Sequence, residues 1–190
     1  MHFAYSAPVQ AEALTTVVIA AQRGDRRAFA ELYHRFHRAV HGVVLTKVRY
    51  GDAADLVQDV FAIVLERLRQ LGEPAAFPGW ILSIARNKAI DHVRGKKPIP
   101  MGEDLPELPV PASRRPEAEQ VLTALRELPE AYQETMILRL VEGMSGPEIA
   151  EQTGLSAGSV RVNLHRGMKL LREKLGIAVG EGGSHGEQVG

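Results

Sequence analysis

Residues 145–172 read SGPEIAEQTGLSAGSVRVNLHRGMKLLR and hold start and stop signals for two short helices. Ser145 can cap the first helix, because Glu148 follows three residues later at the spacing of a capping box. Gly154 ends that helix, since a tight turn needs a positive φ that glycine adopts without steric cost. Ser156 can then cap the second helix. Two capped helices separated by a glycine turn are typical of a helix-turn-helix.

The second of these helices has two unlike faces. Its apolar face is a stripe of side chains at helical spacing, formed by Val160, Leu164, Met168 and Leu171. Its other face is basic and hydrogen-bonding, and consists of Arg161, Asn163, His165, Arg166, Lys169 and Arg172. Such a helix can pack on a core and enter the major groove of DNA. The pattern also allows an ordinary amphipathic hairpin whose basic face is merely solvated.

Charge is distributed unevenly along a chain whose formal net charge is zero. Basic residues dominate residues 79–97 and again the segment after Gly154, whereas acidic residues outnumber basic ones between 102 and 130. Two basic blocks around an acidic bridge favour a bipartite nucleic-acid-binding protein over a neutral enzyme. The chain has 190 residues and is 45% hydrophobic, so it can form a globular core.

Several classes of protein are disfavoured by what the sequence lacks. It contains no cysteine, which excludes disulfides and thiolate metal sites. The apolar stretch near the N-terminus, residues 17–21, is too short to span a membrane and lacks the flanks of a signal peptide. No glycine-rich phosphate loop, nucleophile elbow or catalytic pair of carboxylates is evident. We therefore expect a cytoplasmic protein that is not an enzyme and uses no cofactor.

Hydrophobic periodicity is helical along nearly the whole chain and predicts an all-α fold. A first domain is expected at residues 14–97, after a flexible N-terminus at residues 1–13. Its helices are expected at Leu14–Gln22, after a cap at Asp25, after a cap at Asp52, and from Gly79 to Arg94. Residues 73–79 contain two prolines and are expected to form the loop before the fourth helix.

A second small domain is expected at residues 117–175. It would contain a helix at 117–128, a helix at 129–141 and the helix-turn-helix. Residues 98–116 between the domains are rich in proline and acidic side chains, which predicts an extended linker. The tail at residues 176–190 is rich in glycine and is expected to be flexible.

Three histidines share one face of the second expected helix. His34, His37 and His41 are spaced three and four residues apart, so they could form a metal site with Glu31 within reach. Against a metal site, no carboxylate is evident that would orient the imidazole rings. We therefore expect a polar helix face and no bound metal.

Four segments together resemble a known family, and they occur in the family's order. They read AAQRGDRRAFAELYHRF at 20–36, GDAADLVQDVFAIVLERL at 51–68, FPGWILSIARNKAIDHVRG at 77–95 and LRELPEAYQETMILRLVEGMSGPEIAEQTGLSAGSVRVNLHRG at 125–167. The family is that of the bacterial RNA polymerase sigma factors of the extracytoplasmic-function type, within the sigma-70 family. Each match is weak alone, but four in sequence around a linker are hard to obtain by chance.

The resemblance implies a function and a set of partners. Such a subunit recruits core RNA polymerase to promoter DNA, reads an upstream element as duplex, and helps to melt a start-proximal element that it reads as single strand. It would be a monomer when free and would not insert into a membrane. Many relatives are held inactive by an anti-sigma factor, and the sequence leaves open whether one binds this chain. The alternative is a dimeric helix-turn-helix repressor or activator that acts on a palindromic site without being a polymerase subunit.

The resemblance also assigns three groups of binding residues. The surface that docks on the coiled coil of the largest polymerase subunit would comprise Asp55, Leu56, Val57, Gln58, Asp59 and Phe61. The start-proximal element would be bound by Arg69, Gln70, Leu71, Gly72, Arg86, Asn87, Lys88, Arg94, Lys96 and Lys97. The upstream element would be bound by Ser156, Gly158, Ser159, Arg161, Val162, Asn163, His165, Arg166 and Lys169. The loop at residues 69–76 would form the pocket for an unpaired base, while basic side chains follow the phosphates.

Two positions of the upstream group depart from the family's usual pattern. Val162 replaces a small polar residue, and Asn163 replaces an arginine. Asn163 could pair with adenine and Val162 could touch a thymine methyl, or Asn163 could face away from the DNA. Trp80 also has two alternative roles, base stacking and burial. We expect burial, because a helix this close to Pro78 needs an anchor.

Overall fold

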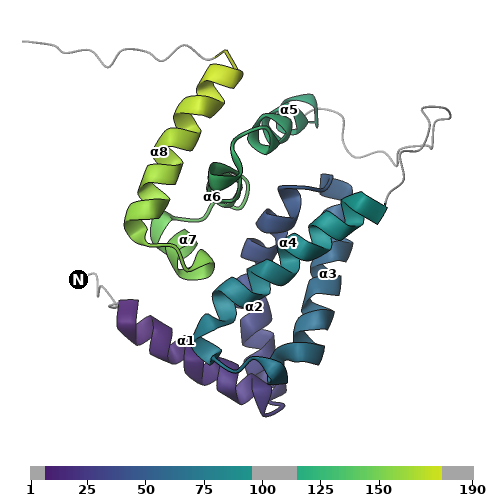
Figure 1. Cartoon of the computed structure of the whole chain (residues 1–190), viewed down its shortest axis with the longest axis vertical. Coiled ribbons are helices and arrows are strands. Elements are labelled where there is room, and N and C mark those ends of the chain that lie inside the picture. Colours follow the sequence, from purple (N-terminus) through teal and green to yellow (C-terminus); the bar gives the residue numbers. More distant parts are fainter. Residues whose placement is uncertain (1–6, 96–114, 177–190) are drawn as a thin grey trace, which may run out of the picture.

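The computed structural model describes residues 7–95 and 115–176, and every regular element in these ranges is helical. The α-helices are α1 Ala7–Gln22, α2 Arg26–Leu45, α3 Tyr50–Arg67, α4 Phe77–Gly95, α5 Arg115–Arg126, α6 Glu130–Leu140, α7 Gly146–Thr153 and α8 Ala157–Lys174 (Figure 1). Two short 3-10 turns, η1 Leu68–Gln70 and η2 Pro74–Ala76, connect α3 to α4. The predicted all-α fold is confirmed. Within the described ranges, no helix is long and apolar enough to cross a bilayer.

Helix α2 lies at the centre of the molecule and packs against α1, α3, α4, α6 and α7. Its apolar residues recur at helical spacing, and Leu32, Phe36, Val40 and Val44 are fully buried. The Asp25 side chain caps its N-terminus, as predicted, by accepting hydrogen bonds from two backbone N–H groups of the first turn. The central helix therefore presents apolar side chains to neighbours on more than one side.

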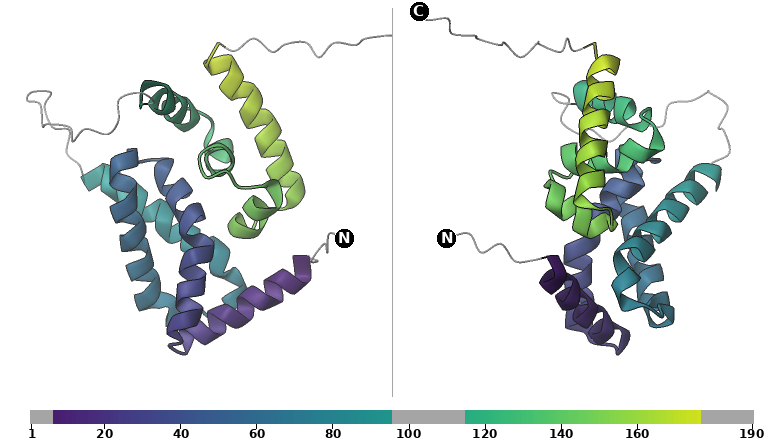
Figure 2. Two further views of the ribbon diagram at one scale, coloured as in Figure 1. Left: turned by 180° about the vertical axis from the view of Figure 1, so that it is seen from behind. Right: turned by 60° about the vertical axis from the view of Figure 1, so that its left-hand side comes forward.

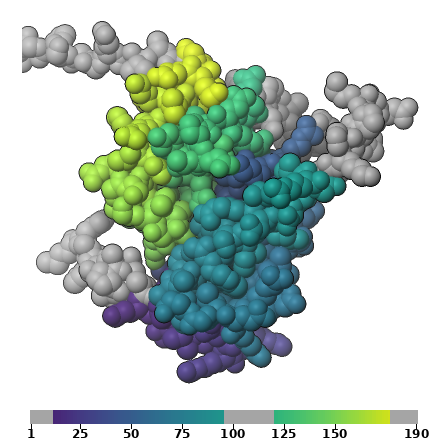
Figure 3. All heavy atoms as spheres, viewed as in Figure 1, coloured from purple at the N-terminus to yellow at the C-terminus, as the bar shows by residue number. Residues whose placement is uncertain are grey.

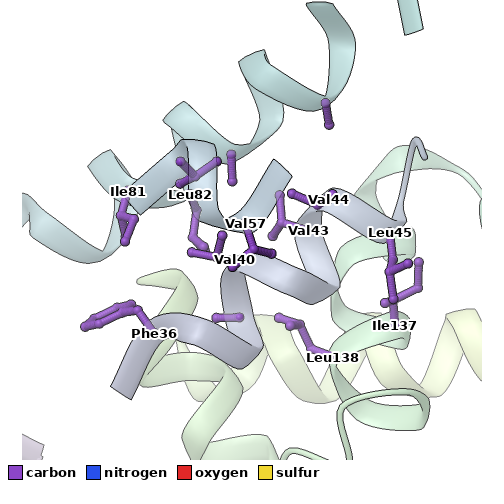
Figure 4. Close-up of a cluster of buried hydrophobic side chains, with 14 of the residues drawn as sticks. Phe36, Val40, Val43, Val44, Leu45, Val57, Ile81, Leu82, Ile137 and Leu138 are labelled. Atoms are coloured by element: carbon purple, nitrogen blue, oxygen red, sulfur yellow. The ribbon is translucent and has the colours of Figure 1, made fainter. Parts of the chain in front are cut away.

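The helices form two bodies, α1–α4 and α5–α8, which Figures 1 and 2 show side by side. Buried residues of both bodies belong to one continuous cluster, which includes Phe36, Val40 and Leu45 of α2 and Ile137 and Leu138 of α6, and Figure 4 shows Ile137 beside Leu45. The two bodies approach closely at Gly42, where a Cβ atom would lie 2.7 Å from Leu138 Cδ2. Figure 3 shows their surfaces in direct contact. This contact between the bodies did not emerge from the sequence.

Polar side chains from both bodies also meet. Arg86 of α4 donates to the carboxylate of Glu134 in α6 through Nε and Nη2, each at 2.9 Å. Arg126 of α5 donates to the carbonyl oxygens of Leu45 and Val48 at 2.9 and 2.7 Å. Further ion pairs between the bodies are Arg35–Glu151, His41–Glu142 and Lys47–Glu130. We call this packing of the two bodies the closed arrangement.

The helix-turn-helix of α7 and α8 follows its sequence signals. Ser145 and Glu148 form the predicted capping box, in which each side chain accepts from the other residue's backbone N–H. Gly154 adopts the left-handed conformation at φ 74° and ends α7. Ser156 caps α8 by accepting from Ser159 N at 3.1 Å.

Helices α1 and α3 begin at residues other than those predicted. Helix α1 begins at Ala7 rather than Leu14, because its alanine-rich first turns favour a helix even without apolar periodicity. Residues 7–13 of the segment expected to be flexible are therefore helical, and residues 1–6 lie outside the described residues. Helix α3 begins at Tyr50 with Arg49 as its N-cap, so Asp52 lies in the first turn and does not cap the helix.

The loop before α4 is shorter than expected. Helix α4 begins at Phe77 and includes Pro78, because proline is tolerated in a first turn, where the missing N–H has no helical partner. Helix α5 begins at Arg115, inside the expected linker, and the rest of that linker lies outside the described residues. Lys96, Lys97 and the tail after Gly176 also lie outside them.

Candidate nucleic-acid interface

Helix α8 is pressed against α6 along its apolar side. Val160 and Leu171 are 1% and 4% exposed. At Gly167, a Cβ atom would lie 2.6 Å from Met136 Cγ, so only glycine allows this close approach of the two helices. The packing directs the opposite face of α8 outward, which is the face that the sequence predicts for DNA.

Four side chains of that outward face lie together. Arg161, Val162, His165 and Arg166 are exposed and line a shallow hollow of about 400 Å³. Val162 is 44% exposed, which is unusual for a valine and leaves its methyl groups available to another surface. Two guanidinium groups, an imidazole and an apolar patch match the chemistry of base edges in the major groove.

Asn163 lies away from this hollow. It is half-buried, and its Nδ2 donates to Thr135 Oγ1 of α6 at 3.4 Å. Of the two alternatives left open by the sequence, this orientation corresponds to the one in which Asn163 faces away from DNA.

The N-terminal end of α8 is also exposed. Ser156, Gly158 and Ser159 lie there, and the first backbone N–H groups of a helix form a site that favours phosphate. Lys169 is exposed farther along the same helix. These residues flank the hollow and could contact the DNA backbone while the hollow faces the bases.

The docking group predicted on α3 divides into an exposed half and a buried half. Asp55, Gln58 and Asp59 are exposed. Leu56, Val57 and Phe61 are 5%, 1% and 4% exposed, so their side chains support the helix from inside rather than face a partner. The predicted group thus combines a polar surface with the core that holds it.

Sequence reasoning missed one residue of this surface. Leu65 is 63% exposed and stands two helical turns after Gln58, on the same face of α3. The signal was an apolar residue at a position where the helical pattern calls for a polar one. Leu65 thus adds an exposed apolar side chain to this face of α3, about 10 Å along the helix from Gln58.

The group predicted to bind the start-proximal element contains exposed residues, one partly buried residue and two residues that form ion pairs within the chain. Arg69, Gln70 and Gly72 of the loop and Asn87 and Arg94 of α4 are exposed. Leu71 is partly buried against the core. Lys88 pairs with Asp59 of the docking surface, with 3.0 Å between Nζ and Oδ2. Arg86 is engaged by Glu134 in the closed arrangement, so its guanidinium already has a carboxylate partner.

The histidine face of α2 borders the contact between the bodies. His37 and His41 stack with 6.4 Å between ring centroids, and His41 Nδ1 lies 2.6 Å from Glu142 Oε1. Burial, followed by the charge of His41, lowers the pKa of His37 below its usual value. Among the described residues, no group of three His, Cys, Asp or Glu side chains is arranged to hold a metal ion.

Trp80 is half-buried and packs against the core of the first body. Its ring lies 6.0 Å from that of Phe77, measured between centroids. The side chain therefore anchors the start of α4, as expected, although part of it reaches the surface.

Comparison with known proteins matches each of the two bodies to a region of one protein family. The family model for sigma-70 region 2 matches residues 32–99, and the model for sigma-70, region 4 matches residues 118–171. The chain is 35% identical over 161 residues to the RNA polymerase sigma factor CarQ of Myxococcus xanthus, covering 80% of this chain and 92% of CarQ. It is 34% identical over 197 residues to the ECF RNA polymerase sigma factor SigD of Mycobacterium tuberculosis, covering 93% and 90% of the two chains.

Two solved structures are similar in fold. One is the structure of CnrH in complex with the cytosolic domain of CnrY, with a TM-score of 0.60, 26% identity, and coverage of 88% of this chain and 99% of that one. The other is the co-crystal structure of the sigma factor RpoE with the anti-sigma factor NepR from Bartonella quintana. It has a TM-score of 0.50 and 19% identity over 80% of this chain and 98% of that one.

Proposed function

The chain belongs to the sigma-70 family, in the extracytoplasmic-function group of RNA polymerase sigma factors. From this premise we propose that it binds core RNA polymerase, directs the enzyme to specific promoters and assists DNA melting at initiation. It acts by binding alone and carries no catalytic step of its own. Its place of action is where the polymerase is, in the cytoplasm.

One observation carries this proposal. Each family region falls on one body of the fold, residues 32–99 on α2–α4 and residues 118–171 on α5–α8, and each body presents basic side chains to solvent, from α4 in the first and α8 in the second. A protein that reads two promoter elements needs two such faces. The dimeric repressor considered as an alternative would need the face on α8 and gives no role to the first body.

We assign the polymerase contact to the exposed half of the α3 group. Asp55, Gln58 and Asp59 supply charge and hydrogen bonds, and Leu65 supplies an apolar contact. An acidic patch with an apolar side chain at its C-terminal edge suits a partner helix with basic side chains, because complementary charge steers association and the apolar contact slows dissociation.

The upstream element is assigned to the outward face of α8. Arg161 and Arg166 can donate to guanine, and Val162 can contact a thymine methyl group. Ser156, Ser159 and Lys169 are assigned to phosphates. Asn163 serves the position of α8 on α6 rather than the bases, since its amide is directed at Thr135.

The start-proximal element is assigned to the loop between α3 and α4 and to the exposed side of α4. The loop receives an unpaired base, and Asn87 lies on the helix that follows it. Arg86, Lys88 and Arg94, together with Lys96 and Lys97 beyond the described part of α4, follow the single strand. The functional units are then the first body together with residues 96 and 97, and the second body, joined by residues 98–114.

A protein partner that holds the chain inactive is part of the proposal. The structure of CnrH, a similar chain, is a complex with the cytosolic domain of CnrY. We propose that an anti-sigma factor binds this chain in a comparable way and that the chain is otherwise a monomer.

Reconstitution tests the function directly. The purified chain is combined with core polymerase on a genomic template library, and transcription start sites are mapped by sequencing. We expect start sites that share an upstream and a start-proximal element and are absent with core polymerase alone. A reconstituted enzyme that initiates no more selectively than core polymerase would contradict the proposal. A dimer that binds a palindromic site without polymerase would favour the repressor alternative.

A further inference from the structure

The loop between α3 and α4 combines buried anchors with exposed groups. Leu68 is 2% exposed and Leu71 packs partly against the core, whereas Arg69, Gln70 and Gly72 are exposed. A pocket that selects one base needs a fixed backbone, because binding groups must be held close to their productive positions. What fixes this backbone therefore bears on promoter selectivity.

The fixing contact comes from the far end of α1. Gln22 is the last residue of that helix, and its Nε2 donates to Leu68 O at 3.0 Å and to Leu71 O at 2.7 Å. The two hydrogens of one amide nitrogen can thus serve a carbonyl at either end of η1. Leu68 O also accepts from Leu71 N at 3.2 Å, which closes the 3-10 turn itself.

Neighbouring contacts hold Gln22 in place. Helix α1 packs against both η1 and η2. Directly after α1, Gly24 turns the chain at φ 94°, and a Cβ atom there would lie 3.6 Å from Arg69 Nη2. The end of α1 therefore lies beside the loop at both Gln22 and Gly24, and the loop is supported by a segment 46 residues away in sequence.

We propose that Gln22 is a positioning residue for the start-proximal element. It sets the shape of residues 68–72 without touching nucleic acid itself, and the exposed groups of this loop then discriminate between bases. The inference rests on the proposed function, since it assigns a role in reading the element that the loop is proposed to bind.

The chain contains a matched control for this contact. Gln133 makes the same kind of contact in the second body, where its Nε2 donates to Arg126 O and Leu128 O, both at 2.6 Å. It is 7% exposed and joins α5 to α6, away from the start-proximal loop. Gln133→Met and Gln22→Met remove the same chemistry from two different loops while keeping side-chain length.

The experiment uses the complete chain with core polymerase. The template is a promoter found by start-site mapping, with its start-proximal element randomised, and transcripts are sequenced to obtain the preference for each base at each position. We expect Gln22→Met to reduce the preference at the unpaired position about 5- to 10-fold, the scale of a lost hydrogen bond that is partly buried. Preference within the upstream element should stay unchanged. Gln22→Lys, which keeps a donor of similar reach, should recover part of the preference.

Thermal melting of the free variants separates positioning from simple loss of stability. Gln133→Met should lower the melting temperature at least as much as Gln22→Met and leave the start-proximal preference intact. The inference is overturned if folded Gln22→Met keeps the wild-type preference, or if Gln133→Met loses it equally. If the wild-type enzyme shows selective initiation but no start-proximal preference, the loop assignment fails and this inference with it. If it shows no selective initiation, the proposed function itself fails.

Discussion

Arg161 and Arg166 are exposed side chains of the second body that line the hollow on α8, and both are proposed to read bases. Arg161→Ala or Arg166→Ala should weaken the use of the upstream element by about 1–3 kcal/mol, because a bidentate contact to a base is lost. The affinity for core polymerase should not change. Transcription from promoters with single substitutions in the upstream element measures the effect.

The control for this prediction lies on the same helix. Arg172 is exposed on α8 about 16 Å along the helix from Arg161, beyond the hollow. Arg172→Ala should reduce binding uniformly across promoter sequences or leave it unchanged. Equal loss of sequence preference in Arg172→Ala and Arg161→Ala would contradict the assignment of base reading to the hollow.

Asp59 pairs with Lys88 and is also proposed to contact the polymerase. Asp59→Lys should weaken binding to core polymerase about tenfold or more, because charge reversal at a docking surface penalises association. The stability of the chain should change little, since an exposed ion pair contributes at most about 1 kcal/mol. Binding is measured by competition with a labelled sigma factor for limiting core enzyme.

A charge swap distinguishes docking from the internal ion pair. The double variant Asp59→Lys with Lys88→Asp restores a pair within the chain but leaves a lysine on the docking surface. It should bind core polymerase as poorly as the single variant. If the swap restores binding, the Asp59 carboxylate acts through Lys88, and its place in the docking surface is wrong.

At the scale of single residues, the sequence located the candidate faces better than their members. The resemblance grouped Asp59 with Val57 on α3, although helical spacing by itself places Asp55, Gln58 and Asp59 on the outer side and Leu56 and Val60 on the inner side, as the structure has them. The orientation of Asn163 depends on Thr135, 28 residues earlier, and Leu65 matches no motif. Side-chain direction is set by tertiary packing, which a local pattern does not contain.

At the scale of elements, the close contact of α8 with α6 at Gly167 makes a sharp prediction. Alanine would gain up to about 1 kcal/mol of helix propensity. Its Cβ would meet Met136 at 2.6 Å, and overpacking of this kind costs about 1–3 kcal/mol. We expect Gly167→Ala to destabilise the second body by about 1–2 kcal/mol in urea unfolding.

A second substitution checks the cause. Met136→Ala opens space where the new Cβ would lie, so its combination with Gly167→Ala should destabilise the chain by less than the sum of the single changes. Additive effects would show that the steric contact between α6 and α8 is not the reason.

Element boundaries followed the sequence where a local signal sets them. The caps at Asp25, Ser145 and Ser156 and the turn at Gly154 were all predicted from side chains that bond to nearby backbone. The same reasoning was wrong for Asp52, which lies in the first turn of α3 and does not cap it. Helix α1 extends to Ala7 through propensity alone, and Arg49 precedes α3 with no side-chain cap hydrogen bond.

At the scale of the whole molecule, the closed arrangement conflicts with the proposed work of α4. Arg86 cannot bind Glu134 and a DNA phosphate with the same donors. We therefore expect the two bodies to separate when the chain joins core polymerase and a promoter. Because the chain has no cysteine, Glu66→Cys and Glu173→Cys would be the sole labelling sites. Energy transfer between dyes at these sites should fall on assembly.

A charge reversal at the contact tests the same expectation in the free chain. Glu134→Lys replaces the Arg86 pair with repulsion and should lower energy transfer before any partner is added. Glu127→Lys is the matched control, because Glu127 pairs with Lys174 inside the second body at 2.9 Å. Energy transfer that stays constant through assembly, or that falls equally in both variants, would contradict the opening.

The division into two bodies was predictable from the acidic, proline-rich segment between them, but their contact was not. Periodicity marks Leu138 as a core residue of its own body and Gly42 as an unremarkable position in a helix. Only the tertiary structure shows that one rests on the other. Surfaces that meet across a long connection leave no local pattern in either partner.

Leu138 and the α2 backbone at Gly42 shield each other from water, so separation of the two bodies exposes both to solvent. The separated form would then expose an apolar patch on each body, and exposed apolar patches promote association with other surfaces. Chains whose two bodies separate in the absence of polymerase should aggregate. The free chain would therefore stay dispersed in a concentrated solution only while the bodies remain in the closed arrangement. A bulkier residue at Gly42 would force the two bodies apart and should make the free chain prone to aggregation.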